Sequence, residues 1–137
     1  MYKTIVVPVD LAHQDKLSRA LKIATDLVRL YDASLHLVSV TSPAPGEVAH
    51  NPKEYTAKLN RFGEQLTASY SIPCQCHVVI SNDPASDLDD VLDRTFHDIG
   101  ADLVVMASHL PGFRDYIFGS NSSYLATHSD LSIFVVR

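Results

Sequence analysis

The sequence predicts an α/β fold in which five parallel strands form one open sheet with helices on both faces. Short apolar runs rich in β-branched residues lack polar alternation, which is typical of strands buried on both faces. Between them, apolar residues recur every three or four positions, the period of an amphipathic helix. This alternation implies right-handed crossovers between parallel strands. The 137 residues fit a single domain over 1–137.

The first half of the chain contains two of the expected strands. An unbroken β-branched run predicts a strand over 4–9, and helical spacing of leucine, alanine and valine predicts a helix over 13–31. A second apolar run predicts a strand over 35–40. Three prolines and a glycine in 41–52 predict a long loop, and long ordered loops are often functional.

The second half continues the same alternation. Each apolar run is preceded by a segment with a helical period. The expected helices cover 53–70, 85–99 and 120–128, and the expected strands cover 76–80, 102–107 and 131–136. A loop is expected from 108 up to the last helix.

The composition excludes several classes of function. The net charge is −5 and the 11 basic residues are scattered, so binding to nucleic acid or to an anionic membrane surface is not expected. No apolar stretch approaches the ~20 residues of a membrane span, and the first apolar run is too short for a signal peptide. We therefore expect a cytoplasmic protein without membrane insertion.

The chain has two cysteines, Cys74 and Cys76, which we interpret as reduced thiols. Neighbouring positions on one strand seldom satisfy disulfide geometry, and a structural zinc site would need four ligands. The seven histidines show no metal-ligand spacing, and His36 and His77 are expected to be structural. We predict no metal site.

The expected ligand site lies beyond the carboxyl ends of the strands, where the strand order reverses. The first strand ends at Asp10, whose carboxylate could orient a ribose or a nucleotide-bound metal, or could cap the next helix. After the fourth strand come Gly119, Ser120 and Asn121. Since a helix is expected over 120–128, the three residues lie at its start, where they could leave backbone N–H groups free for phosphate or form an ordinary helix cap.

Several catalytic motifs are absent from the sequence. It contains no G-x-G-x-x-G after the first strand, no G-x-x-x-x-G-K-[ST] and no G-x-S-x-G. Ser108 and His109 are sequence neighbours without a placed acid, which makes them a poor nucleophile–base pair. We therefore predict no catalytic residues.

Four sequence features together resemble the universal stress protein family across essentially the whole chain. They are the opening I-V-V-P-V-D, the strand end M-A-S-H, the G-S-N segment and the terminal S-I-F-V-V-R. The resemblance is greatest to F/G-type members. It implies a Rossmann-like, adenine nucleotide alpha hydrolase-like fold, binding of ATP or AMP, and homodimers that pair the last strand.

The resemblance also implies roles for individual residues. Pro8, Val9 and Asp10 would border the adenosine and Val40 the adenine, while Met106, Ala107 and His109 would line the pocket and Gly119, Ser120 and Asn121 would cradle phosphates. Core packing is the alternative for the apolar members, Met106 above all. The family motif is G-x-x-G, nine residues, then G-[ST]. In this chain, Ala107 and Leu110 replace the first two glycines of the motif. Eight residues, in place of nine, separate Leu110 from Gly119.

These features favour a regulatory nucleotide-sensing module of the stress response that binds ATP or AMP, with magnesium left open. Hydrolysis would at most be slow, because His109 is the sole nearby base. The alternative is a dimeric interaction module of the same fold that binds no nucleotide, which Ala107 and Leu110 favour. A homodimer would cover the apolar edge strand at 133–136, although a helix or loop could shield it instead. The regulated protein partner is not identified by the sequence.

Overall fold

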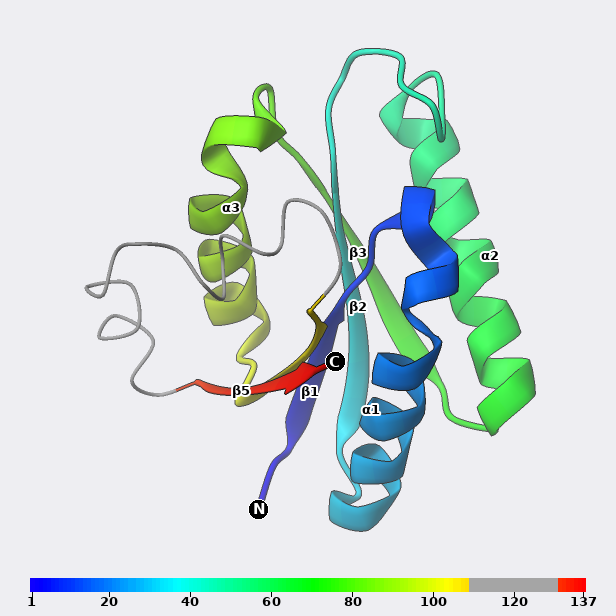
Figure 1. The fold of residues 1–137 in the computed structure, drawn as a ribbon, viewed down its shortest axis with the longest axis vertical. Coiled ribbons are helices and arrows are strands. Elements are labelled where there is room, and N and C mark those ends of the chain that lie inside the picture. The colour runs from blue at the N-terminus through cyan, green and yellow to red at the C-terminus, as the bar shows by residue number, and fades with distance from the viewer. Residues whose placement is uncertain (109–130) are drawn as a thin grey trace.

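The five strands expected from the sequence lie side by side in one parallel sheet (Figure 1). The computed structural model describes residues 1–108 and 131–137. The strands are β1 (Thr4–Pro8), β2 (Ser34–Thr41), β3 (Cys74–Ile80), β4 (Leu103–Ala107) and β5 (Ser132–Val136). Their order is β3-β2-β1-β4-β5, and each neighbouring pair is parallel. The predicted fold class is confirmed.

Helices cover both faces of this sheet (Figure 1). α1 (Ser18–Tyr31) and α2 (Pro52–Tyr70) lie on one face, and α3 (Pro84–Ile99) lies on the other. Right-handed crossovers explain this arrangement, because the chain moves outward from β1 to β3 and then returns past β1 to β4. The helix expected over 120–128 lies outside the described residues.

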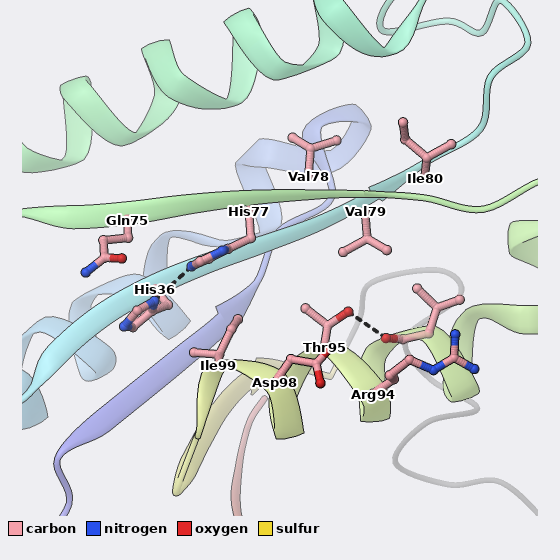
Figure 2. Close-up of a pocket in the computed structure, with 11 residues that line it drawn as sticks. His36, Gln75, His77, Val78, Val79, Ile80, Arg94, Thr95, Asp98 and Ile99 are labelled. Carbon is pink, nitrogen blue, oxygen red and sulfur yellow. Dashed lines mark hydrogen bonds between the residues drawn. The ribbon is translucent and has the colours of Figure 1, made fainter.

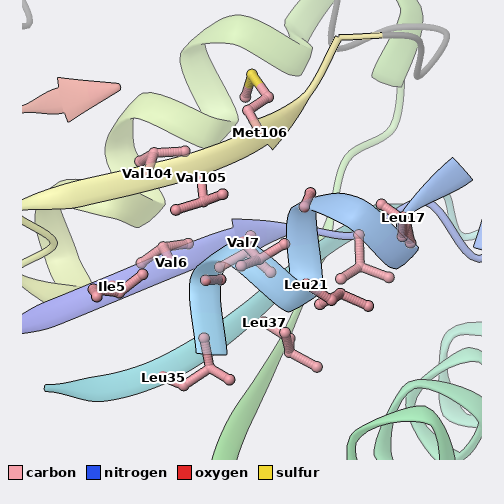
Figure 3. Close-up of a cluster of buried hydrophobic side chains, with 14 of the residues drawn as sticks. Ile5, Val6, Val7, Leu17, Leu21, Leu35, Leu37, Val104, Val105 and Met106 are labelled. Carbon is pink, nitrogen blue, oxygen red and sulfur yellow. The ribbon is translucent and has the colours of Figure 1, made fainter. Parts of the chain in front are cut away.

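The core surrounds β1, whose apolar side chains are buried on both sides of the sheet (Figure 3). Ile5, Val6 and Val7 are fully buried, as are Val104 and Val105 of the neighbouring β4. Helix layers on both faces leave no solvent-facing side for these strands, which explains their unbroken β-branched sequence. Within residues 1–108, no helix has both the length and the apolarity to cross a bilayer.

The start of the first helix differs from the expectation of one helix over 13–31. A 3-10 helix, η1 (Leu11–Lys16), precedes α1, and His13 inside it has a non-helical φ of −132° and ψ of 45°. Asp10 caps this turn by accepting a hydrogen bond from Ala12 N. The chain therefore turns directly after β1. The boundary prediction was wrong because one local cap overrode the apolar period.

The β3 strand also begins earlier than expected, at Cys74 in place of residue 76. The parallel register with β2 pairs Leu35 with Cys74 and continues to Thr41 and Ile80. Hydrogen bonding to β2 therefore determines where β3 begins, although Cys74 and Gln75 add little to its apolar run.

α2 approaches β3 closely at Gly63, which is buried in the interior of the helix. A Cβ atom there would lie 2.7 Å from Cys76 Sγ and 3.1 Å from Cys74 Sγ. Cys74 Sγ donates a hydrogen bond to Gly63 O at 3.4 Å, and Cys76 Sγ donates one to Leu59 O at 3.7 Å. Both cysteines are free thiols, as expected. The missing side chain at Gly63 therefore makes room for two sulfur atoms.

We predict that Gly63→Ala destabilises the natural chain but stabilises a chain in which both cysteines are alanine. Alanine in a helix interior is normally favoured over glycine by about 0.5–1 kcal/mol. The new Cβ would collide with Cys76 Sγ, and that penalty disappears when the sulfurs are removed. Chemical denaturation of the four chains measures the free energy of unfolding. A stabilising effect in the natural chain would contradict the close contact.

Candidate functional site

The order of the strands reverses between β1 and β4. β2 and β3 lie on one side of β1, and β4 and β5 lie on the other. In open α/β sheets, ligands bind beyond the carboxyl ends of the strands at such a reversal, which here is the edge where β1 and β4 end. The end of β1 brings Pro8, Val9 and Asp10 to this edge. The end of β4 brings Ala107 and Ser108 to the same edge.

Asp10 has two hydrogen-bond partners at this edge. One carboxylate oxygen accepts from Ala12 N at 3.0 Å, and the other lies 2.9 Å from His13 Nδ1. Of the two roles considered for Asp10, the structure shows the capping role. Its side chain retains 24% exposure, which leaves part of the carboxylate open to solvent at the strand end.

A buried polar network joins the ends of β1 and β2 to α2. Ser39 Oγ donates a hydrogen bond to Val9 O at 2.6 Å and lies 2.5 Å from Tyr55 Oη. Val9 N donates to Val38 O at 2.8 Å. Burial raises the pKa of Tyr55, so its hydroxyl stays protonated at neutral pH. The network fixes the backbone of Val9 immediately before the Asp10 carboxylate.

The other predicted site residues have different environments. Val40 is half-buried on β2, whereas Met106 is completely buried in the hydrophobic core. Ala107 is buried at the end of β4. His109, Gly119, Ser120 and Asn121 lie outside the described residues, so their predicted roles stay predictions.

A cavity of about 490 Å³ lies where β4 and β5 end near the start of α1. Its lining combines small or apolar strand residues with charged side chains from the first helical turns and the chain end: Asp15, Lys16, Ser18, Arg19, Ala107, Val136 and Arg137. The charged side chains in this lining are three cations and one carboxylate. α1 also begins without a side-chain cap, and the amino end of a helix carries a partial positive charge. The cavity is electrostatically suited to an anion.

The cations of this cavity were missed from the sequence, where the basic residues look scattered. Lys16 and Arg19 are three positions apart at a helix start, which is the only local signal for the cluster. Arg137 is far from both in the sequence. It joins them because β5 lies beside β4 and both strands end at the same edge.

Ser108 adds a buried hydroxyl next to Ala107 in this region. Its backbone N donates to Val136 O at 2.9 Å, which extends the pairing of β4 with β5. Within residues 1–108 and 131–137, the Ser108 Oγ atom has no hydrogen-bond partner. A buried hydroxyl without a partner costs about 1–3 kcal/mol, so a polar ligand group reaching this atom would relieve that cost.

A second cavity of about 740 Å³ lies between β3 and α3 (Figure 2). His36 and His77 stack on its sheet side with ring centroids 5.1 Å apart, and His36 Nδ1 lies 2.9 Å from His77 Nε2. Arg94 and Asp98 of α3 also line it. Burial lowers the pKa of both histidines, and the neighbouring charge of His77 lowers that of His36 further. The two rings therefore favour the neutral state.

Neither cavity contains an evident site for a metal with three or more protein ligands. Among the residues that the structure describes, no group of three or more His, Cys, Asp or Glu side chains is placed to hold a metal ion.

Comparison with known proteins gives one consistent result. The sequence model of the Universal stress protein family matches residues 1–137. The chain is 30% identical over 146 residues to universal stress protein G of Salmonella typhimurium, and the match covers 100% of both chains.

Solved structures have a similar fold. A universal stress protein in complex with cAMP has a TM-score of 0.65 at 22% identity, with 99% of this chain and 97% of that chain covered. The universal stress protein from Archaeoglobus fulgidus in complex with dAMP has a TM-score of 0.62 at 20% identity, with 99% and 98% covered.

We predict that the free energy of unfolding falls as the pH is lowered from about 7 to about 5, in part because of His36 and His77. Their pKa values are lowered in the folded chain, so the unfolded chain binds more protons below about pH 6.5. The double variant His36→Gln/His77→Gln should have a shallower pH dependence in urea denaturation. His50→Gln, at an exposed position, is the control. Identical slopes in the natural chain and the double variant would rule out this contribution.

Proposed function

Because the chain belongs to the universal stress protein family, we propose that it is a regulatory module that binds an adenine nucleotide where β1 and β4 end. The observation that carries the proposal is the cationic cavity at the carboxyl ends of β4 and β5, lined by Lys16, Arg19 and Arg137. Phosphate groups are the part of a nucleotide that such a cluster would bind.

The neighbouring strand ends suit the rest of the nucleotide. Val9 and Asp10 lie at the end of β1, and Val40 lies near the end of the adjacent β2. An adenosine placed over these residues would direct its phosphates along the strand ends toward β4. Ser108 Oγ, which lacks a partner among the described residues, is then available as a donor to the ligand.

Two relatives of similar fold support adenine nucleotides as the ligand class, since their structures contain cAMP and dAMP. We propose ATP or AMP for this chain and treat the need for magnesium as part of the test. The free thiols Cys74 and Cys76 suit a reducing compartment, and we infer a cytoplasmic location.

A homodimer is also part of the proposal. β5 is an edge strand of the sheet, and Phe134 on it is 42% exposed. An apolar edge strand is prone to pairing with other chains, and a second copy related by a two-fold axis would cover it. The regulated protein partner would then bind to a dimer of this chain.

We predict that Arg19→Ala weakens the binding of ATP about tenfold, equivalent to about 1.4 kcal/mol, and leaves adenosine binding unchanged. The guanidinium would be lost from the phosphate end of the site only. Calorimetric titration with ATP, AMP and adenosine, with and without magnesium, measures these affinities. Lys22→Ala is the matched control, because Lys22 lies one turn further along α1 and pairs with Asp26.

Two results would contradict this assignment. Equal loss of ATP and adenosine binding in Arg19→Ala would place the phosphates elsewhere. If the natural chain binds none of these ligands, the dimeric interaction module without nucleotide becomes the better supported function.

We predict that Phe134→Lys shifts the dimer toward monomer and weakens self-association at least tenfold. Burial of a phenylalanine side chain contributes about 1.5–3 kcal/mol, and each dimer would lose two such contacts. Sedimentation equilibrium measures the association constant. Ile80→Lys changes an exposed apolar residue on the opposite edge strand, β3, and should have no effect. Dissociation by Ile80→Lys alone would move the interface to β3.

A further inference from the structure

A third cavity, of about 380 Å³, lies between α2 and β3, on the opposite side of β3 from His77. Its lining consists of polar helix residues and two strand cysteines: Asn60, Gly63, Glu64, Thr67, Cys74 and Cys76. Side chains two positions apart on a strand point to the same face, so both thiols face α2. Neither thiol takes part in the proposed nucleotide site.

The protein holds the two sulfur atoms in place from the helix side. Each thiol donates to a helix carbonyl, of Gly63 or of Leu59, and Thr67 Oγ1 lies 3.8 Å from Cys74 Sγ. The two sulfur atoms are neighbours in space, because both would lie within 3.1 Å of a Cβ atom added at Gly63. Gly63 contributes no side chain between them, and both cysteines are only half-buried. The pair is therefore ordered and still accessible from the cavity.

We propose that Cys74 and Cys76 form a two-coordinate site for a soft monovalent metal cation, Cu(I). Thiolates are the soft ligands that Cu(I) prefers, and Cu(I) is satisfied by two of them. Zinc takes four ligands, and the described residues place no group of three or more together. Coordination releases the thiol protons to solvent and changes the oxidation state of neither copper nor sulfur.

The strand geometry favours a bridging ion over a disulfide. Residues two apart on a strand are separated by about 6.6 Å along the backbone, and their side chains leave the strand in the same direction, so their Cβ atoms are about as far apart. A disulfide needs its two Cβ atoms at about 3.5–4.5 Å. A disulfide would therefore need β3 to bend away from its pairing with β2, which runs through both cysteines. A metal ion between the sulfurs spans a longer gap without bending the strand. Glu64 in the cavity lining adds a carboxylate that attracts a cation.

The test is an anaerobic titration of the reduced full chain with Cu(I) in competition with a colorimetric Cu(I) chelator. We expect one Cu(I) per chain, and X-ray absorption should show two sulfur ligands and no nitrogen. Cys74→Ser and Cys76→Ser should each abolish binding, and circular dichroism establishes that each variant is folded. Because either variant is sufficient, failure of one to fold leaves the test intact.

Two further variants test whether copper binds between these two sulfur atoms and not elsewhere on the chain. His77→Gln removes an imidazole from the opposite face of β3 and should leave the affinity unchanged. Gly63→Ala keeps both cysteines but moves the sulfurs, and should weaken binding at least tenfold. Loss of binding in His77→Gln, retention in either serine variant, or full affinity in Gly63→Ala would overturn the proposal. None of these outcomes depends on nucleotide binding.

Discussion

Burial of β1 between two strands and two helix layers is the constraint on which the other features depend. Val6 pairs with His36 of β2 on one side and with Val104 of β4 on the other. The stretch of residues 5–9 is completely buried and contains no polar side chain. Asp10 is the first carboxylate after β1, and it lies where the strand order reverses. The position of the site therefore follows from the burial of the strand before it.

The same physics explains what could be predicted from the sequence. The buried strands were found because they need unbroken apolar runs, and the Pro8–Asp10 edge followed from the rule for strand ends. The turn at η1 was missed because it depends on one hydrogen bond to Asp10. The cluster of Lys16, Arg19 and Arg137 was missed because it exists only when β5 lies beside β4. Contacts between distant segments leave no local period in the sequence.

The edge strand β3 shows how a single strand can present different chemistry on its two faces. Cys74 and Cys76 point toward α2, and His77 points the other way, toward His36. The sequence analysis did not place Cys74 on the expected strand, and it did not indicate what would lie opposite the two cysteines. Gly63 is the missing part, because a larger residue there would fill the space that the sulfurs occupy. Its significance is visible only once α2 is packed against β3.

β5 occupies the corresponding position at the other edge and connects the two parts of the proposed function. Phe134 lies at the exposed edge, while Val136 and Arg137, two and three residues later, line the cationic cavity. Pairing of β5 with a second copy would restrict the strand whose end forms the cavity wall. A ligand that fixes Arg137 would restrict the same strand from its carboxyl end. Because thermodynamic coupling between two binding events is reciprocal, any effect of nucleotide on self-association must be matched by an equal effect of self-association on nucleotide affinity. Because β5 is only five residues long, the proposed dimer edge and the proposed phosphate site share one short element.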